Sequence, residues 1–537
     1  MFLKHIHYFT TLPYQNARLI ILKIGWRLFF FALIMYHVKV ESAKGQLNTV
    51  RIDQGKNNMH NFETGNREEA IRYRFTLKES LFGDGAFYRR VAMVVLPMII
   101  QNTLSNIVGL LDNVMVGQVG TLPMSSVAIV NQILFVFYLC IWGSLAGAGI
   151  FSTQFFGKGD MDGVRYAIRF KLLTAITIFT VAVLILYNFG PNLVSLYISP
   201  DTPSADRAAT LGYCISYLNI MLVGLLPFSL TQVYASAMRE SGRTTLPMVA
   251  SMIAMVVNFI FNALLIFGLF FFPKMGVLGA ATATVISRFT ELLIVLAGAH
   301  RRGSVYGFFK GLYSHFRIPG NLVLPILGRT LPLLCNEFLW SLAQATLLQA
   351  YSIRGIAVIA AMNISGTISQ IFNEVFLSIG NSSGIIIGQE LGADRLVNAR
   401  RTAWRMAALS IMSTLVMGSL LALAAPFIPQ IYNTEPEIRS LATRFIWVVA
   451  MCMPINAYAN VSYFTMRSGG KTAITFLFDS CFSWAVSVPA AYVLSRFTTL
   501  PAINVFVIVN LLEIIKCIIG FCLVRSGVWV RNIVKAA

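Results

Sequence analysis

Four carboxylates lie within otherwise apolar stretches of this chain. They are Asp112, Glu337, Glu374 and Asp479. A charged group at the centre of a bilayer costs at least about 2.5 kcal/mol, so residues of this kind commonly mark the pathway of an ion or a substrate. In general, burial favours the neutral form of a carboxyl group and a nearby cation favours the ionised form, so a buried carboxylate can exchange a proton for a cation. These acids are therefore candidates for a coupling device.

Asp112, in the stretch NIVGLLDNVMVG at 106–117, has three candidate partners. The stretch NFIFN places Asn258 and Asn262 four residues apart, on one face of a helix, and Thr284 lies in the next apolar segment. Carboxylate, amide and hydroxyl oxygens are hard ligands, suited to Na⁺ or to a network that carries a proton. The alternative is that these side chains only form hydrogen bonds between helices.

Two of the other acids are followed closely by tryptophan. NEFLW contains Glu337 and Trp340, and FDSCFSW contains Asp479 and Trp484. An acid beside an aromatic ring suits an organic cation, because charge attraction and cation–π attraction act together. A packing aromatic beside a hydrogen-bonded acid is the equally simple alternative. Two pairs of opposite charge, three residues apart, are interpreted as charge neutralisation within a helix: Arg288 with Glu291, and Glu513 with Lys516.

The composition is typical of a membrane protein, in which charged residues within apolar stretches are unusual. Of 537 residues, 56% are hydrophobic and 12% are charged, whereas soluble domains average about 25% charged residues. The net charge is +20, but the Lys and Arg residues lie at the ends of apolar runs and form no continuous basic face with interleaved aromatics. We therefore expect a lipid bilayer around the chain and no nucleic-acid partner. The seven cysteines lack the spacing of a metal or redox site, so no cofactor is expected.

Apolar segments of about 20 residues, enough to cross a bilayer core of about 30 Å, follow one another from residue 91. Their expected starts are near residues 91, 125, 168, 209, 246, 277, 330, 356, 403, 440, 472 and 502. The sequence therefore predicts an all-α membrane protein with twelve transmembrane helices in two six-helix bundles. The predicted parts are an N-terminal extension at 1–90, an N-lobe at 91–299, a cytoplasmic linker at 300–329, a C-lobe at 330–525 and a cytoplasmic tail at 526–537.

The extension at 1–90 does not share this pattern. Its segment 17–38 is apolar but contains Lys23 and Arg27. This segment is interpreted as an extra anchor, as an uncleaved signal-like segment, or as sequence translated upstream of a start at Met59. We expect the residues before Met59 to be dispensable.

The two bundles are predicted to be copies of one another. Features of the first half recur after a constant shift of 235 residues: Leu96-Pro97, Gly120, Gln154, Gly157 and Arg165 return as Leu331-Pro332, Gly355, Gln389, Gly392 and Arg400. MRESGRT at 238–244 returns as MRSGGKT at 466–472. Because each copy has an even number of spans, the axis that relates them should follow the membrane normal. The interface between the copies is the expected substrate cavity.

Pro97 lies in the same apolar segment as Asp112. Proline lacks an N–H group, which frees a carbonyl in the preceding turn and permits a bend. Pro97 is therefore a candidate conformational hinge. Its repeat partner Pro332 leaves open that both prolines belong to the architecture of the repeat.

Loops rich in Lys and Arg alternate with loops that mostly contain one basic residue. The rich loops include Lys158 and Arg165, Arg239 and Arg243, Arg301 and Arg317, Arg395 and Arg405, and Arg467 and Lys471. Because basic loops face the cytoplasm, both termini of the main bundle are predicted to be cytoplasmic. We expect a multi-pass protein of the plasma membrane, which is the inner membrane if the source is a Gram-negative bacterium.

Over roughly residues 85–530 the chain resembles the multidrug and toxic compound extrusion (MATE) family. The resemblance rests on LPMIIQNTLSNIVGLLDNVMVGQVG, TQFFGKGD and MRESGRTTLP, and on NEFLWSL, MRSGGKT and FDSCFSW, which are similar to a bacterial branch. It implies two six-helix bundles around a V-shaped cavity, and antiport of drug-like, often cationic compounds against H⁺ or Na⁺. It also implies that Asp112 is the main cation-coupling residue, surrounded by Asn258, Asn262 and Thr284. We expect a monomer.

Some members of that family carry an acid where this chain has Asn262, and others where it has Asn456, which leaves the C-lobe cation site open. The nearest alternative function is a lipid-linked oligosaccharide flippase of the same superfamily, but such proteins usually need a strongly basic cavity. An intramembrane enzyme is a weaker alternative, because HExxH, P-loop and GxSxG motifs are missing. The GKGD at 157–160 is similar to the GxGD motif of intramembrane aspartyl proteases, but it lies in a charged loop and not within an apolar segment. It is therefore interpreted as a turn. The sequence thus favours a transporter over an enzyme.

Overall fold

A computed structural model describes residues 76–198, 203–301, 303–314, 316–432 and 434–535. The described residues form helices, turns and loops without strands, and they include 12 helices that are long and apolar enough to cross a membrane. The predicted all-α membrane fold is therefore confirmed. The apolar segment 17–38 lies outside the described residues.

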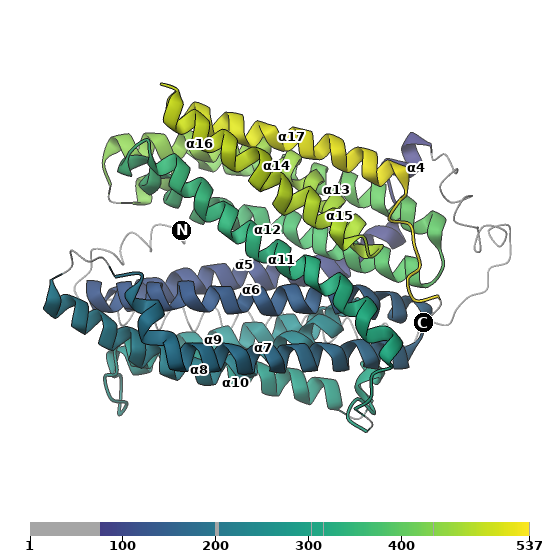
Figure 1. Ribbon diagram of the computed structural model, residues 1–537, viewed down its shortest axis with the longest axis horizontal. Helices are drawn as coiled ribbons and strands as arrows, with labels where there is room; N and C mark the ends of the chain where they lie inside the picture. The colour runs from purple at the N-terminus through teal and green to yellow at the C-terminus, as the bar shows by residue number, and fades with distance from the viewer. Residues whose placement is uncertain (1–75, 199–202, 302, 315, 433, 536–537) are drawn as a thin grey trace.

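Two bundles of helices lie one above the other in Figure 1, with the N-lobe in purple to teal and the C-lobe in green to yellow. The N-lobe consists of α5 (Gly85–Gly117), α6 (Thr121–Lys158), α7 (Met161–Ser195), α8 (Ser204–Glu240), α9 (Thr245–Phe267) and α10 (Val277–His300). The C-lobe consists of α11 (Gly320–Ser352), α12 (Ile356–Gly392), α13 (Leu396–Ala424), α14 (Pro436–Ser468), the segment α15 (Thr472–Phe476) to α16 (Val488–Phe497), and α17 (Ala502–Ser526). Three short elements complete the described chain: α4 (Leu77–Leu81), η1 (Gly307–Phe309) and η2 (Ile428–Ile431).

Several helices begin before the positions expected from hydropathy. Hydropathy detects only the part of a helix within the hydrocarbon, whereas α6 has 38 residues, which at 1.5 Å per residue extends for about 57 Å. Polar side chains start some of these outer turns: Asp84 and Asp160 cap α5 and α7 by accepting from backbone N–H groups. α11 likewise begins at Gly320, inside the stretch 300–329 predicted as a linker.

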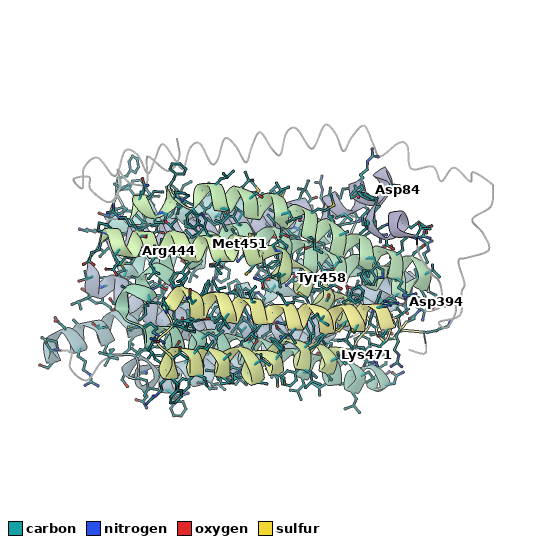
Figure 2. All side chains as sticks on the ribbon, turned by 90° about the horizontal axis from the view of Figure 1, so that it is seen from above. Asp84, Asp394, Arg444, Met451, Tyr458 and Lys471 are labelled. Atoms are coloured by element: carbon teal, nitrogen blue, oxygen red, sulfur yellow. The ribbon has the colours of Figure 1, made fainter. Side chains whose placement is uncertain are left out.

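The loops rich in Lys and Arg all lie at one end of the molecule. Figure 2 shows Asp84, Asp394 and Lys471 together at that end and Arg444 toward the opposite end. We call the end with these three residues the basic end, because the loops richest in Lys and Arg connect the helices there.

The loop between the lobes is packed against the N-lobe. Phe308 and Phe309 are buried in the large N-lobe core. The guanidinium group of Arg169, on α7, donates to three backbone carbonyls of this loop, including that of Leu312 at 2.9 Å. The connection between the lobes is therefore held in place by α7.

The lobes meet closely at the basic end, where α6 crosses α12. A Cβ atom at Gly157 would overlap the carbonyl oxygen of Gln389, and a Cβ atom at Gly392 would overlap that of Gln154. These four residues are the repeat-related pairs identified in the sequence. Glycine at both positions allows the two backbones to touch, so the two copies contact each other through the same residues.

The residues after α17 also pack at the basic end. Trp529 is fully buried against residues of the C-lobe. Ile533 donates its backbone N–H to Gln154 Oε1, on α6 of the N-lobe, at 2.8 Å. The predicted tail is thus a C-terminal segment, 527–535, that contacts both lobes.

Candidate functional site

The structure brings Asp112 together with the two asparagines of α9. Asn262 Nδ2 donates to Asp112 Oδ1 at 2.7 Å, and Asn262 is only 1% exposed. The spacing of four residues between Asn258 and Asn262 places both on the face of α9 that packs against α5. An amide that donates to a carboxylate stabilises its charge where little water is present.

The amide of Asn258 can serve Asp112 in two ways. The terminal amide atom of Asn258 that faces Asp112 lies 3.0 Å from Asp112 Oδ1 and 3.1 Å from Asp112 Oδ2. With nitrogen there, Asn258 donates to both carboxylate oxygens. With oxygen there, three oxygens converge, an arrangement that needs a shared proton or a cation. Rotation of one amide therefore changes the group from a donor site to an acceptor site.

A second acceptor is available at the same place. Within the described part of the chain, Asn262 Oδ1 is buried without a hydrogen-bond partner. Unsatisfied buried acceptors are uncommon and are often explained by an ion or a water. The oxygens of Asp112, Asn258 and Asn262 are the ligands that Na⁺ or a proton-linked network would use.

Thr284, on α10, contacts Asn258 and not Asp112 itself. With the Asn258 oxygen toward Asp112, Thr284 Oγ1 accepts from Asn258 Nδ2 at 3.4 Å, and it donates to the carbonyl of Ala280 in its own helix. Tyr217, on α8, was not identified from the sequence; it is buried in the N-lobe near Asp112. A lone tyrosine in an apolar segment has no spacing signal that would identify it.

Pro97 is buried within α5, which continues through it. The carbonyl that a proline frees is that of the residue four positions earlier, here Met93. Thr244 Oγ1, from the turn between α8 and α9, donates to Met93 O at 3.0 Å. The freed carbonyl is thus satisfied by a side chain of the repeated MRESGRT motif, a partnership between distant segments that the sequence did not predict.

Glu337 and Asp479 lie in different surroundings. Glu337 faces α6, where a Cβ atom on Gly143 would lie 3.4 Å from its Cγ. A cavity of about 390 Å³ lies between α6 and α11 beside this point and is lined by Val136, Leu139, Cys140, Leu334, Cys335, Phe338 and Leu339. Trp340 is 38% exposed. Glu337 therefore lies at the seam between the lobes, next to an apolar cavity.

Asp479 lies inside the C-lobe, in a stretch of π-helix. Leu477–Cys481 (η3) and Ser483–Ser487 (η4) are π-helical, and Pro489 follows, whose ring would clash with the preceding turn of a regular α-helix. Lys516 Nζ donates to Asp479 Oδ1 at 2.7 Å. The interpretation that Lys516 only neutralises Glu513 is therefore incomplete, because Lys516 also reaches a second helix.

The indole of Trp484 donates from Nε1 to the carbonyl of Leu339 at 2.9 Å. This bond fixes Trp484 to α11, and the structure records no ring contact between Trp484 and a cation among the described residues. The rings near a cation here are those of Phe478 and Phe482, which flank Lys516. Trp484 thus packs against α11, while the rings of Phe478 and Phe482 lie beside the lysine that pairs with Asp479; a substrate role for Asp479 and Trp484 stays a prediction.

Glu374, the fourth acid, connects the lobes. It is 9% exposed on α12, and Asn106 Nδ2 of α5 donates to its Oε1 at 3.2 Å. Closer to the basic end, Arg90 of α5 forms an ion pair with Glu390 of α12 at 3.2 Å. Both contacts join the helix that carries Asp112 to the opposite lobe.

The sequence profile of the MatE family matches this chain twice, at residues 97–264 and at 332–493. Together the two matches cover more than half of the chain. The chain belongs to the MatE family. Each match covers the first five spans of one lobe, which agrees with the internal duplication. The family resemblance stated from the sequence is thereby confirmed.

Two relatives of this MatE chain come from Bacillus subtilis and Thermotoga maritima. The probable multidrug resistance protein YoeA of Bacillus subtilis is 24% identical over 78% of this chain and 89% of its own length. The probable multidrug resistance protein NorM of Thermotoga maritima is 22% identical over 83% of this chain and 94% of its own length. The relatives are thus matched over nearly their whole length.

Solved structures share the fold of this MatE chain. A mutant of the Vibrio cholerae MATE transporter VcmN aligns with a TM-score of 0.74 at 17% identity, over 85% of this chain and 99% of that one. A MOP superfamily transporter from Pyrococcus furiosus aligns with a TM-score of 0.73 at 17% identity, over 84% and 98% of the two chains. At this identity the comparison establishes the fold of two six-helix lobes.

Proposed function

We propose that this MatE chain exports organic, often cationic compounds in exchange for H⁺ or Na⁺, by alternating access of its two lobes. The observation that supports this most directly is the Asp112 site, where Asn262 donates to the carboxylate at 2.7 Å. An unpartnered buried oxygen of the same Asn262 lies beside it. Such a site can hold a charged carboxylate and can also accept a cation or a proton.

The exchange follows from the two arrangements of this site. With the site unoccupied by an ion, amide N–H groups compensate the charge of Asp112. When an ion arrives, the amide of Asn258 turns its oxygen inward and the carboxylate charge is neutralised. If the two lobe arrangements tolerate the charged form differently, ion binding shifts the equilibrium between them, because a ligand moves an equilibrium by its differential affinity. A potential of 100 mV adds about 2.3 kcal/mol for each charge moved.

The expected orientation is supported by the basic end, which the positive-inside rule places in the cytoplasm. The lobes are joined at this end by the crossing of Gly157 and Gly392. In this orientation the chain is closed toward the cytoplasm, the arrangement in which an exporter releases its substrate outward. The proposed location is the plasma membrane, or the inner membrane of a Gram-negative source, with the protein acting as a monomer.

The C-lobe acids are proposed to receive the substrate. Glu337 adjoins the apolar cavity between α6 and α11, and an acid next to apolar walls suits a lipophilic cation. Trp340, on the same helix, has an exposed ring that can serve as an aromatic platform. Asp479 and Trp484 also contact α11, where Asn336 donates to Asp479 Oδ2 and Trp484 donates to the carbonyl of Leu339.

The test is gradient-driven transport in proteoliposomes loaded with a fluorescent organic cation. Asp112→Asn preserves shape and removes the charge, so we expect normal expression and substrate binding but loss of efflux driven by an imposed pH or Na⁺ gradient. Separate pH and Na⁺ gradients identify the coupling ion. Asp162→Asn is the matched control, because this acid is exposed at the start of α7. If Asp112→Asn concentrates substrate at the wild-type rate, the coupling assignment is wrong and Glu337 is the next candidate.

A flippase for a pyrophosphate-linked lipid would need basic side chains available in its cavity. Two lysines within the spans are instead paired with acids: Lys171 Nζ lies 2.5 Å from Glu240, and Lys516 Nζ lies 2.7 Å from Asp479. These contacts favour a cationic substrate over an anionic headgroup.

A further inference from the structure

Three charged side chains form a compact group inside the C-lobe, which we call the ion triad: Asp479, Glu513 and Lys516. Lys516 Nζ lies 2.7 Å from Asp479 Oδ1 on the π-helical stretch and 3.3 Å from Glu513 Oε2 on its own helix. The side chain of Lys516 is 10% exposed, and those of the two acids are 20% exposed. A single ammonium group is therefore shared between two carboxylates that keep limited access to their surroundings.

The surroundings of Lys516 match those that a bound organic cation would need. Its Nζ lies 5.6 Å from the centre of the Phe478 ring and 5.9 Å from that of Phe482, within the range of cation–π attraction. The second oxygen of Asp479 accepts from Asn336 Nδ2 at 3.2 Å, which fixes the carboxylate. Acid and aromatic rings thus surround a cation that belongs to the chain itself.

The repeat shows that this charge arrangement is particular to the C-lobe. Counted from the first residue of each helix, Arg288 of α10 corresponds to Glu513 of α17, and Glu291 corresponds to Lys516. The order of the charges is reversed between the lobes. In the N-lobe, the guanidinium group of Arg288 lies over the Tyr138 ring. The architecture that the two lobes share therefore does not require a lysine at the position of Lys516, opposite the fifth span of its lobe.

We propose that Lys516 is an internal competitor for cationic substrates, which occupies Asp479 until a monovalent organic cation displaces it. This inference rests on the proposed function, in which the C-lobe acids receive the substrate. Displacement leaves Lys516 paired with Glu513, so its ammonium keeps one of its two carboxylate contacts. The long flexible stem of lysine allows this small movement. Lys516 then sets specificity, because only a positively charged substrate can replace the charge that it withdraws from Asp479.

The experiment measures equilibrium binding of tetraphenylphosphonium to the purified full chain without any ion gradient. Lys516→Met removes the competing charge, so we expect tetraphenylphosphonium to bind about tenfold more tightly, as expected when a like charge within about 7 Å is removed from a partly buried site. Asp479→Asn in the Lys516→Met background should remove most of that gain. Binding of neutral triphenylphosphine oxide should change by less than about twofold.

Lys516→Gln keeps a hydrogen-bond donor and also lacks the charge, so it repeats the test if the methionine variant does not fold. Lys516→Arg retains the competing charge and should bind like the wild type, and Glu291→Gln alters the corresponding position of the N-lobe without an expected effect. Unchanged or weaker tetraphenylphosphonium binding in the folded charge-free variants would overturn the proposal. If the wild-type chain exports tetraphenylphosphonium but Lys516→Met binds it with unchanged affinity, only this inference is refuted. If the wild-type chain shows no gradient-driven efflux of tetraphenylphosphonium, the proposed function is refuted.

Discussion

Each acid within the spans has its own relation to the helices around it. Asp112 accepts from Asn262, Glu374 accepts from Asn106, and a lysine of another helix compensates Asp479. Isolated charges are costly in a membrane, so partners of this kind are expected. Glu374 and Glu337 both lie at the seam between the lobes, Glu374 against α5 and Glu337 beside Gly143 of α6.

Glu337→Gln should weaken the binding of cationic substrates more than that of neutral ones, since only cations use the lost charge. We expect a loss of about fivefold to tenfold for a cation at the partly screened seam and almost none for a neutral analogue. Binding isotherms for a charged and a neutral probe of similar size measure the difference. Trp340→Ala should show the same preference if its ring is a platform. Equal losses for both probes would indicate that Glu337 has a structural role.

At the scale of elements, two of the helices that contain proline accommodate it in different ways. In α5, Thr244 supplies a hydroxyl group to the carbonyl freed by Pro97. Before Pro489, the backbone forms the π-helical stretch that carries Asp479. Either device keeps a polar backbone group from being left unsatisfied in the membrane, and each one lies on a helix with a candidate site residue.

Thr244→Val preserves the shape of the side chain but removes the hydroxyl group that donates to Met93. An acceptor left unsatisfied within a membrane span costs about 1 to 3 kcal/mol, so we expect a lower midpoint of thermal unfolding in detergent. Thr244→Ser retains the hydroxyl group and should unfold close to the wild type. Identical midpoints for valine and wild type would show that the Met93 carbonyl finds another partner.

At the scale of the whole molecule, the basic end is held closed by contacts that cross between lobes. The Gly157 and Gly392 crossing and the ion pair of Arg90 with Glu390 join α5 and α6 to α12. The C-terminal segment adds a further connection: besides its bond to Gln154, the carbonyl of Val534 accepts from Lys158 Nζ at 2.9 Å. Opening this end requires these contacts to separate.

Truncation after Val530 removes the contacts of the C-terminal segment with α6 and leaves Trp529 in place. Three hydrogen bonds to α6 are lost, each contributing about 1 kcal/mol, so the closed arrangement should be less populated. With the seven native cysteines replaced, a cysteine at Met98, which is 6% exposed at the seam, should react faster with an impermeant maleimide applied to inside-out vesicles. Removal of Ala536 and Ala537 alone is the control. Equal labelling rates would show that this segment does not hold the lobes together.

The sequence by itself determined the features that depend on local pattern. Apolar segments of membrane-spanning length predicted the 12 spans, because burial in lipid requires an unbroken run of apolar residues. The duplication was visible because copied residues keep their order. Asn258 and Asn262 were recognised as one face of a helix, because helical spacing of four residues is a local property.

Only the tertiary structure decided which side chains meet across helices. Lys516 lies three residues from Glu513 in sequence, and nothing in that spacing shows that it also reaches Asp479. Likewise, the partner of the carbonyl freed by Pro97 is Thr244, from a distant turn. The predicted tail became a packed segment, because the environment of Trp529 is formed by helices from elsewhere in the chain. Such contacts depend on how helices pack and rotate against each other, and a linear pattern of residue types does not specify that geometry.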